Sequence, residues 1–431
     1  MPKRNTDPFL DRSAESLLTN NEARISVIKC ALGIGCLAMP LAFYNSGYIN
    51  GVIGTVTIGT ILVYAIHKLM NAMHVLCERN QIPSLTYRES MEMAFLNVSP
   101  KLSRFSQFAG SLVDICQALY HYGICCVYII FISDTLKELI YSIANISIEI
   151  PLKLCMILMI LPLILIFSIQ DFQDLVPYSL AANILIIIGL LIIFVHLCYD
   201  LPSLSEREAF QDVKQLPLFY GTIVFSLESI GVLFAIEANM KSPSHFLGKY
   251  GILNQGMLVV IFIYLMMGFY GYWHYGDDTK SNIILNLPNL ALNQVVQIIY
   301  AIGIYFSYAL QGDVAVDVIW RQFMSKNVCD QWRIPLEKIV RIIIVLSSVL
   351  VCLAFPDFDL ILPLVGSSCI SFLGLIFPAI IDLCTRYPDG YGSCNIHLFV
   401  DIFLIILGIV GGVSGTLIGV LGIYNRITSV T

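Results

Sequence analysis

The sequence predicts an all-α integral membrane protein with eleven transmembrane helices. Of its 431 residues, 57% are hydrophobic and only 13% are charged, whereas soluble chains carry about 25% charged residues. Eleven apolar stretches are long enough to cross a bilayer, which takes about 20 helical residues, and short polar loops separate them. The net charge is −6 and no basic block is present, so we expect the lipid bilayer and not nucleic acid as a partner.

The predicted helices follow one another without a separate soluble domain. They cover residues 25–46, 51–76, 107–131, 153–169, 177–198, 217–238, 252–274, 292–320, 338–355, 360–382 and 396–424. Residues 1–24 are polar and lack the apolar region of a signal peptide. We therefore expect an N-terminal tail (1–24), a transmembrane transporter domain (25–424) and a short C-terminus (425–431).

The distribution of positive charge predicts the orientation of these helices. Lysine and arginine gather in the tail and in alternate loops, which predicts a cytoplasmic N-terminus and an extracytoplasmic C-terminus. The sequon Asn145-Ile146-Ser147 then lies outside, where Asn145 is a candidate glycosylation site.

Neither the cysteines nor the histidines form a recognisable metal site. The 13 cysteines lie mostly inside apolar runs, as small core residues do, and no pair has the spacing of metal ligands. The sequence also lacks a nucleophile elbow and a phosphate-binding loop. We expect no cofactor, no metal and no enzymatic activity.

Helix breakers interrupt the first predicted span. Ile25–Gly47 contains Gly33-Ile34-Gly35 near its middle and Pro40 beyond. Unwound backbone at membrane depth is tolerated only where it lines a cavity or is buried in protein, and broken helices form the substrate sites of secondary transporters. Freed N–H groups at the second half-helix suit a carboxylate. The alternative is close packing of helices through small residues.

The sixth predicted span has the same character as the first. Residues 217–238 carry Gly221, Ser226, Ser229 and Gly231 in an otherwise apolar run. A broken helix at the start of each half predicts a 5+5 inverted repeat with a binding site at the midplane. The eleventh helix lies outside this repeat.

Glu228 in the sixth span is the candidate proton-coupling residue. Intramembrane carboxyls usually mark ion or substrate paths, so Glu228 either takes up a proton or binds a substrate ammonium. The alternative is a structural carboxyl paired with Lys29. Ser226 and Ser229 beside it either bind substrate or bond back to their own helix.

Several motifs in order along the chain resemble the amino acid/auxin permease family, in its proton-coupled amino acid transporter branch. They are Lys29 with Gly33-x-Gly35 and Leu37–Ala42, Gly123–Ile129, Phe225–Val232 with Ile236–Met240, Gly271-Tyr272, and Ile284–Pro288. The resemblance runs from about residue 24 to the C-terminus. It implies a LeuT-type fold that moves small amino acids, usually with protons.

The chain also departs from this branch. Ala31 and Ile34 replace a polar asparagine and threonine of the glycine motif, and Ser26 stands where proton-coupled members often carry a histidine. Serine does not titrate near neutral pH, so the usual coupling residue is missing.

These arguments give one set of candidate substrate-binding residues, of which Tyr122 and Ser307 rest on the fold analogy alone. The set is Gly33, Ile34, Gly35, Cys36, Phe225, Ser226, Ser229, Tyr122 and Ser307.

The resemblance favours a secondary active transporter, a solute carrier for small neutral amino acids that works by alternating access, with protons as coupled ions. The alternative is an amino-acid-sensing receptor on the same fold with little flux. The expected location is the plasma membrane or a lysosomal or endosomal membrane.

Overall fold

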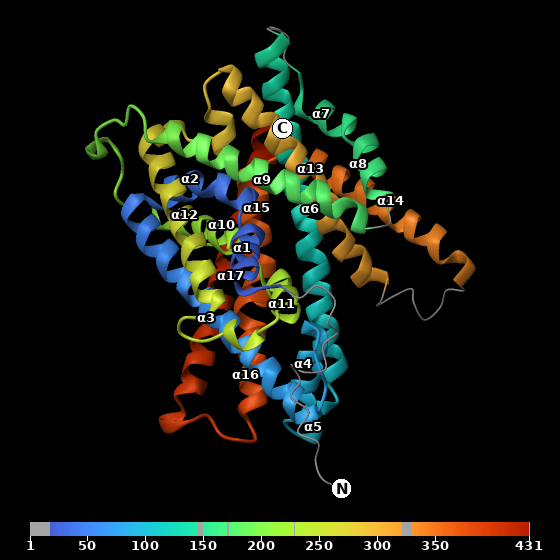
Figure 1. The fold of residues 1–431 in the computed structure, drawn as a ribbon. Helices are drawn as coiled ribbons and strands as arrows, with labels where there is room; N and C mark the ends of the chain where they lie inside the picture. Colours follow the sequence, from blue (N-terminus) through green and yellow to red (C-terminus); the bar gives the residue numbers. More distant parts are fainter. Residues whose placement is uncertain (1–17, 145–149, 170–171, 228, 321–329, 431) are drawn as a thin grey trace.

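The structure is a computed structural model, which describes residues 18–144, 150–169, 172–227, 229–320 and 330–430. The described residues form an all-helical bundle (Figure 1). Their extended pairing is limited to an isolated bridge between Leu18 and Met240, which joins the start of the described chain to the segment after the sixth predicted span.

The α-helices and the π-helical segment η7 occupy most of the described chain. They are α1 (Asn20–Ala31), α2 (Ile34–Ser46), α3 (Tyr48–Asn80), α4 (Tyr87–Leu96), α5 (Pro100–Ser103), α6 (Ser106–Ala144), α7 (Leu152–Leu158), α8 (Ile160–Phe167), α9 (Phe172–Leu197), α10 (Leu216–Ser226), α11 (Ile230–Ala238), α12 (Ile252–Tyr275), α13 (Ala291–Ile319), α14 (Asp330–Ala354), α15 (Phe358–Val365), η7 (Gly366–Ile376), α16 (Phe377–Arg386) and α17 (Ile396–Val430). The short 3₁₀ turns include η5 (Ile283–Asn286).

The first helix begins earlier than the sequence predicts. Thr19 caps α1 because its side chain accepts from Glu22 N–H while the Glu22 carboxylate accepts from Thr19 N–H, a capping box that fixes the helix start. Residues 20–24, expected in the tail, are therefore helical. At the other end, α17 continues to Val430.

Seven described helices are long and apolar enough to cross a membrane, and eight if the pair α1 and α2, bent by 54°, forms one span. The other three predicted spans are also helical. Two of them are shorter apolar helices, Leu152–Phe167 and, where side chains are described, Ile184–Leu197. The third, α14, begins with charged residues such as Arg333 and Lys338, so its apolar part is shorter than the helix.

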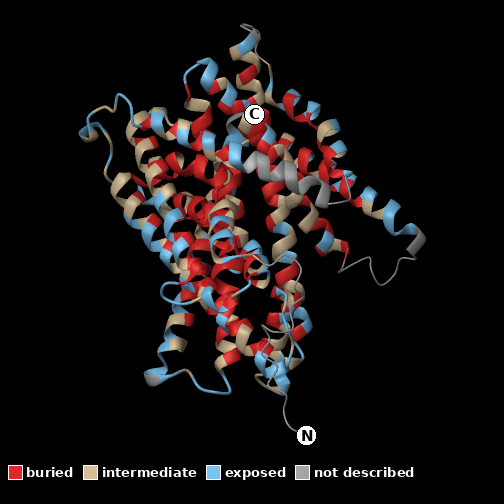
Figure 2. Ribbon diagram, viewed as in Figure 1, coloured by how far each residue is buried: buried red, intermediate tan, exposed pale blue. Residues whose placement is uncertain are grey.

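Buried residues concentrate in the centre of the bundle (Figure 2). The last helix, α17, exposes large apolar side chains including Phe399, Ile406 and Val410, as expected of a lipid-facing surface. Its opposite face carries a stripe of small residues, Gly408, Gly412, Gly415 and Gly419. A Cβ added to Gly412 or Gly415 would lie 3.1 Å or 2.5 Å from the side chains of Ser371 or Ser367 on η7, so this stripe packs against the bundle.

A buried cluster of charges connects α3, α16 and α17. Lys68 Nζ lies 2.7 Å from Asp382 Oδ2 and 2.5 Å from Asp401 Oδ1, and Arg386 Nε donates to Asp382 at 2.8 Å. Lys68, Asp382 and Asp401 are 4%, 1% and 0% exposed. Charges buried away from water are stable only when they pair with opposite charges. The cluster therefore fixes the three helices relative to one another.

Candidate functional site

Both predicted helix breaks are present, and they touch one another. In the first span α1 ends at Ala31 and α2 begins at Ile34; in the sixth, α10 ends at Ser226 and α11 begins at Ile230. A Cβ added to Gly35 would lie 2.6 Å from Ser226 Cα. Only glycine permits this approach, so Gly35 brings the two breaks together.

Gly33 plays a different part from Gly35. Its φ of −135° is one that any residue adopts, and a Cβ added there would meet no atom within 4 Å. The same open space surrounds Gly231 at the start of α11. These two glycines border empty volume, whereas Gly35 is packed.

Tyr264 of α12 holds the two breaks from a third helix. Its hydroxyl contacts the carbonyl oxygen of Ala31, the last residue of α1, and lies 3.0 Å from the carbonyl oxygen of Ser226, the last residue of α10. The side chain is 0% exposed. Each carbonyl belongs to the unsatisfied C-terminal end of a half-helix.

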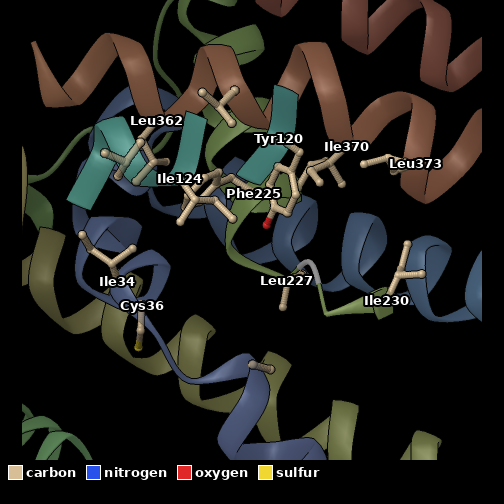
Figure 3. Close-up of a cluster of buried hydrophobic side chains, with 14 of the residues drawn as sticks. Ile34, Cys36, Tyr120, Ile124, Phe225, Leu227, Ile230, Leu362, Ile370 and Leu373 are labelled. Atoms are coloured by element: carbon tan, nitrogen blue, oxygen red, sulfur yellow. The ribbon is translucent and has the colours of Figure 1, made fainter. Parts of the chain in front are cut away.

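A cavity of about 580 Å³ adjoins the breaks. It extends along α1 and α11 and between α6 and α13, and Tyr87 of α4 also borders it. Figure 3 shows a cluster of buried hydrophobic side chains that includes part of this lining, with Phe225 of α10 beside Tyr120 and Ile124 of α6. The ring centroids of Tyr120 and Phe225 are 6.2 Å apart.

Seven of the nine predicted substrate-binding residues line this cavity. They are Gly33, Ile34, Gly35, Phe225, Ser226, Ser229 and Ser307. Cys36 and Tyr122 lie outside its lining. Glu228 and Asn145 fall outside the described residues, so their roles stay predictions.

Helical geometry explains why Cys36 and Tyr122 lie elsewhere. Successive α-helical residues are about 100° apart, so Cys36 points away from Ile34, and it is 2% exposed in the core. The cavity face of α6 runs through Gln117, Tyr120, His121, Ile124 and Tyr128, a spacing of three and four residues that Tyr122 does not share.

The three cavity serines differ in what their hydroxyls do. Ser226 Oγ donates to Thr222 O at 2.7 Å, which is the internal bonding that the sequence left open as an alternative. Ser307 Oγ likewise donates to Gly303 O at 2.9 Å. Ser229 Oγ is buried without a hydrogen-bond partner among the described residues. A buried hydroxyl left unpaired costs about 1–3 kcal/mol, so Ser229 is the hydroxyl available to a ligand.

Sequence reasoning overlooked several polar residues of the cavity, among them His121, Gln117, Tyr87 and Tyr264. His121 Nδ1 lies 2.7 Å from Gln311 Oε1 across the cavity. An ionisable residue inside an apolar stretch is a signal that could have identified His121. Tyr264 has no such signal, because it is one of 22 tyrosines in the chain.

The electrostatics of the breaks suit a small zwitterion. The N-terminal ends of α2 and α11 offer free N–H groups and positive dipole ends, and the C-terminal ends of α1 and α10 offer carbonyl oxygens and negative ones. The described lining is otherwise neutral except for Lys29 and the titratable His121. The arrangement can hold a carboxylate and an ammonium with an uncharged side chain between apolar walls.

Comparison with known proteins shows which family nearly the whole chain matches. The family model described as "Transmembrane amino acid transporter protein" matches residues 18–421. The chain is 34% identical over 412 residues to the Drosophila melanogaster "Proton-coupled amino acid transporter-like protein pathetic", with 95% of this chain and 86% of the relative covered. It is 27% identical over 431 residues to the Arabidopsis thaliana "Amino acid transporter AVT3C", with 96% and 93% covered.

Solved transporter structures share the fold. The inward-facing conformation of Mhp1 matches with a TM-score of 0.57 at 11% identity, covering 97% of this chain and 96% of that one. A substrate-bound, outward-open Na⁺-coupled sialic acid symporter matches with a TM-score of 0.52 at 15% identity, covering 96% and 93%. At these identities the similarity concerns the fold alone, which is the LeuT-type fold.

Proposed function

Because the chain belongs to the transmembrane amino acid transporter family, whose members are multi-pass membrane proteins and not enzymes, we propose that it moves small neutral amino acids by alternating access. The observation that carries this proposal is the pair of touching helix breaks beside a cavity of about 580 Å³. The cavity extends along α1, which follows the N-terminal tail, and along α11, whose end is joined to the start of the described chain by the bridge between Leu18 and Met240. With the predicted cytoplasmic tail, this arrangement corresponds to a site open to the cytoplasm.

The same proposal assigns the parts of the substrate to the parts of the site. The α-carboxylate binds the N–H groups at Gly33–Gly35 and the Ser229 hydroxyl, and the ammonium binds the carbonyl ends of α1 and α10. The side chain lies against Phe225, Ile124 and their neighbours. The helices α7 with α8, α9 and α14 supply the three further crossings of an eleven-span transporter.

Ser229→Ala is expected to raise the KM for a transported neutral amino acid about threefold to tenfold, the range of one net hydrogen bond. The Ser229 hydroxyl has no hydrogen-bond partner among the described residues, so removing it costs the substrate its contact and leaves the helix intact. Concentration-dependent uptake of radiolabelled substrate measures the change.

Ser307→Ala is the matched control, because that hydroxyl already bonds Gly303. Its KM should stay within about twofold of the wild type, a difference below one net hydrogen bond. Equal effects of the two substitutions would contradict the assignment of Ser229.

Proton coupling has two candidate residues. Glu228 is the carboxyl that the sequence places between the half-helices, and His121 is the titratable cavity residue bonded to Gln311. Ionisable residues inside membrane spans usually mark ion or substrate paths, so His121 is the second candidate in a chain that carries Ser26 at the usual histidine position.

Purified protein in liposomes is expected to take up neutral amino acids faster when a proton gradient points inward. A protonophore should remove the stimulation. Glu228→Gln or His121→Gln should abolish it where that residue carries the proton, while uptake without a gradient continues.

Three outcomes separate the alternatives. Binding of amino acids without any uptake would favour the sensing receptor over the carrier. Uptake indifferent to the gradient would refute proton coupling alone. Neither binding nor uptake of any small neutral amino acid would refute the proposed substrate class.

A further inference from the structure

One hydroxyl group serves two helix ends at the centre of the site. The Tyr264 hydroxyl contacts the carbonyl oxygens of both Ala31 and Ser226. Tyr264 also borders the cavity although its side chain is 0% exposed. The hydroxyl therefore lies at the boundary between the packed core and the space available to a ligand.

The number of donors and acceptors does not balance at this point. A phenol carries one proton to donate, and the two carbonyl oxygens each accept. Both carbonyls end a half-helix, where the dipole is negative and favours a positive charge. An ammonium group carries three N–H donors and a full charge, so it satisfies this pair of acceptors better than the hydroxyl does.

We propose that the Tyr264 hydroxyl takes the place of the substrate ammonium while the site is empty. It occupies the Ala31 and Ser226 carbonyls while the site is empty and gives them up when an amino acid binds. The inference rests on the proposed function, because it requires a substrate that carries an ammonium. It makes Tyr264 a positioning residue that keeps both breaks assembled between transport cycles.

This replacement has a measurable consequence for how the site recognises the amino group of a substrate. In the wild type the ammonium binds the two carbonyl oxygens only by displacing the hydrogen bonding that the Tyr264 hydroxyl already provides to them. In Tyr264→Phe the carbonyls are empty before binding, so the ammonium contributes more to affinity. A ligand without the amino group displaces nothing in either protein.

The experiment compares L-alanine with propionate, its deaminated analogue, and L-leucine with 4-methylpentanoate if alanine does not bind. Dissociation constants are measured on full-length wild type and Tyr264→Phe by competition binding. The ratio of the constant for the acid to that for the amino acid is expected to rise about threefold to tenfold in the variant, the range of one net hydrogen bond.

Tyr305→Phe is the matched control. Tyr305 also donates to a backbone carbonyl, that of Pro162 at 2.7 Å, and neither residue lines the cavity. The ratio should not change in this variant.

Two results would overturn the inference. If Tyr264→Phe loses affinity equally for the acid and the amino acid, Tyr264 stabilises the site in every state and is not displaced by the ammonium. If the ratio of dissociation constants falls in this variant, the Tyr264 hydroxyl binds the substrate directly. If Tyr264→Phe does not fold, fluorotyrosine at position 264 is the second variant, because it keeps the shape of the side chain and makes its hydroxyl a stronger hydrogen-bond donor. The ratio of dissociation constants should then fall below the wild-type value. An unchanged or higher ratio contradicts the proposal. Failure of the wild type to bind either amino acid would refute the proposed function instead.

Discussion

Lys68→Met is expected to destabilise the protein by about 3–5 kcal/mol, the usual cost of breaking a buried ion pair from one side. The substitution keeps most of the side-chain volume and removes the only charge that contacts both Asp382 and Asp401 among the described residues. The remaining cluster of two aspartates and Arg386 then carries a net negative charge inside the bundle. The midpoint of thermal unfolding in detergent measures the loss.

The pairing within the cluster provides an internal rescue. Arg386 bonds Asp382, while Asp401 has Lys68 as its charged partner. Lys68→Met combined with Asp401→Asn therefore removes one charge of each sign and leaves the Asp382–Arg386 pair in place. The double variant should recover most of the lost stability.

Lys280→Met is the exposed counterpart. Lys280 lies 3.8 Å from Glu138, and both side chains are about half exposed, at 51% and 42%. Such a pair contributes about 0–1 kcal/mol, so the midpoint should hardly move. If Lys68→Met were equally harmless, the cluster would have to be accessible to water.

The helix breaks could be predicted because local sequence encodes them. Gly33 and Gly35 interrupt the apolar run of the first span, and the serines and glycines of the sixth span do the same. The expected second interruption at Pro40 was wrong, because α2 continues through it from Ile34 to Ser46. Backbone that cannot continue a helix in a membrane has few alternatives. The structure confirms both breaks, with the first bent by 54°.

The side-chain partners could not be predicted, because they depend on distant parts of the chain. Lys68 meets aspartates 314 and 333 residues away, and no local pattern connects them. The cavity face of α6 was missed for another reason: Gln117 and His121, two polar residues four apart, mark one side of this helix, but Tyr122 was assigned by fold analogy alone. Tyr122 was therefore a candidate and His121, one residue before it, was not.

Gly35→Ala is expected to reduce transport about 100-fold, the scale of a displacement of about 1 Å at a site that depends on geometry. The added methyl would lie 2.6 Å from both Cα and Oγ of Ser226. Backbone cannot rotate away as a flexible side chain does, so the two breaks must separate. The N–H groups proposed for the carboxylate then move away from the carbonyls proposed for the ammonium. Uptake in liposomes and the thermal midpoint measure function and stability together.

Two further variants separate the effect of the distance between the two helix breaks from the effect of the added side-chain volume. Gly33→Ala adds the same methyl two residues earlier, where no atom lies within 4 Å, so this variant should fold normally and change KM more than maximal rate. Ser226→Gly combined with Gly35→Ala removes the side-chain atoms that the methyl would meet and leaves the backbone of residue 226 in its way, so transport should return in part. Wild-type transport by Gly35→Ala would show that the breaks need not touch. Equal losses in Gly33→Ala and Gly35→Ala would show that cavity volume, and not the approach of the two helices, limits transport.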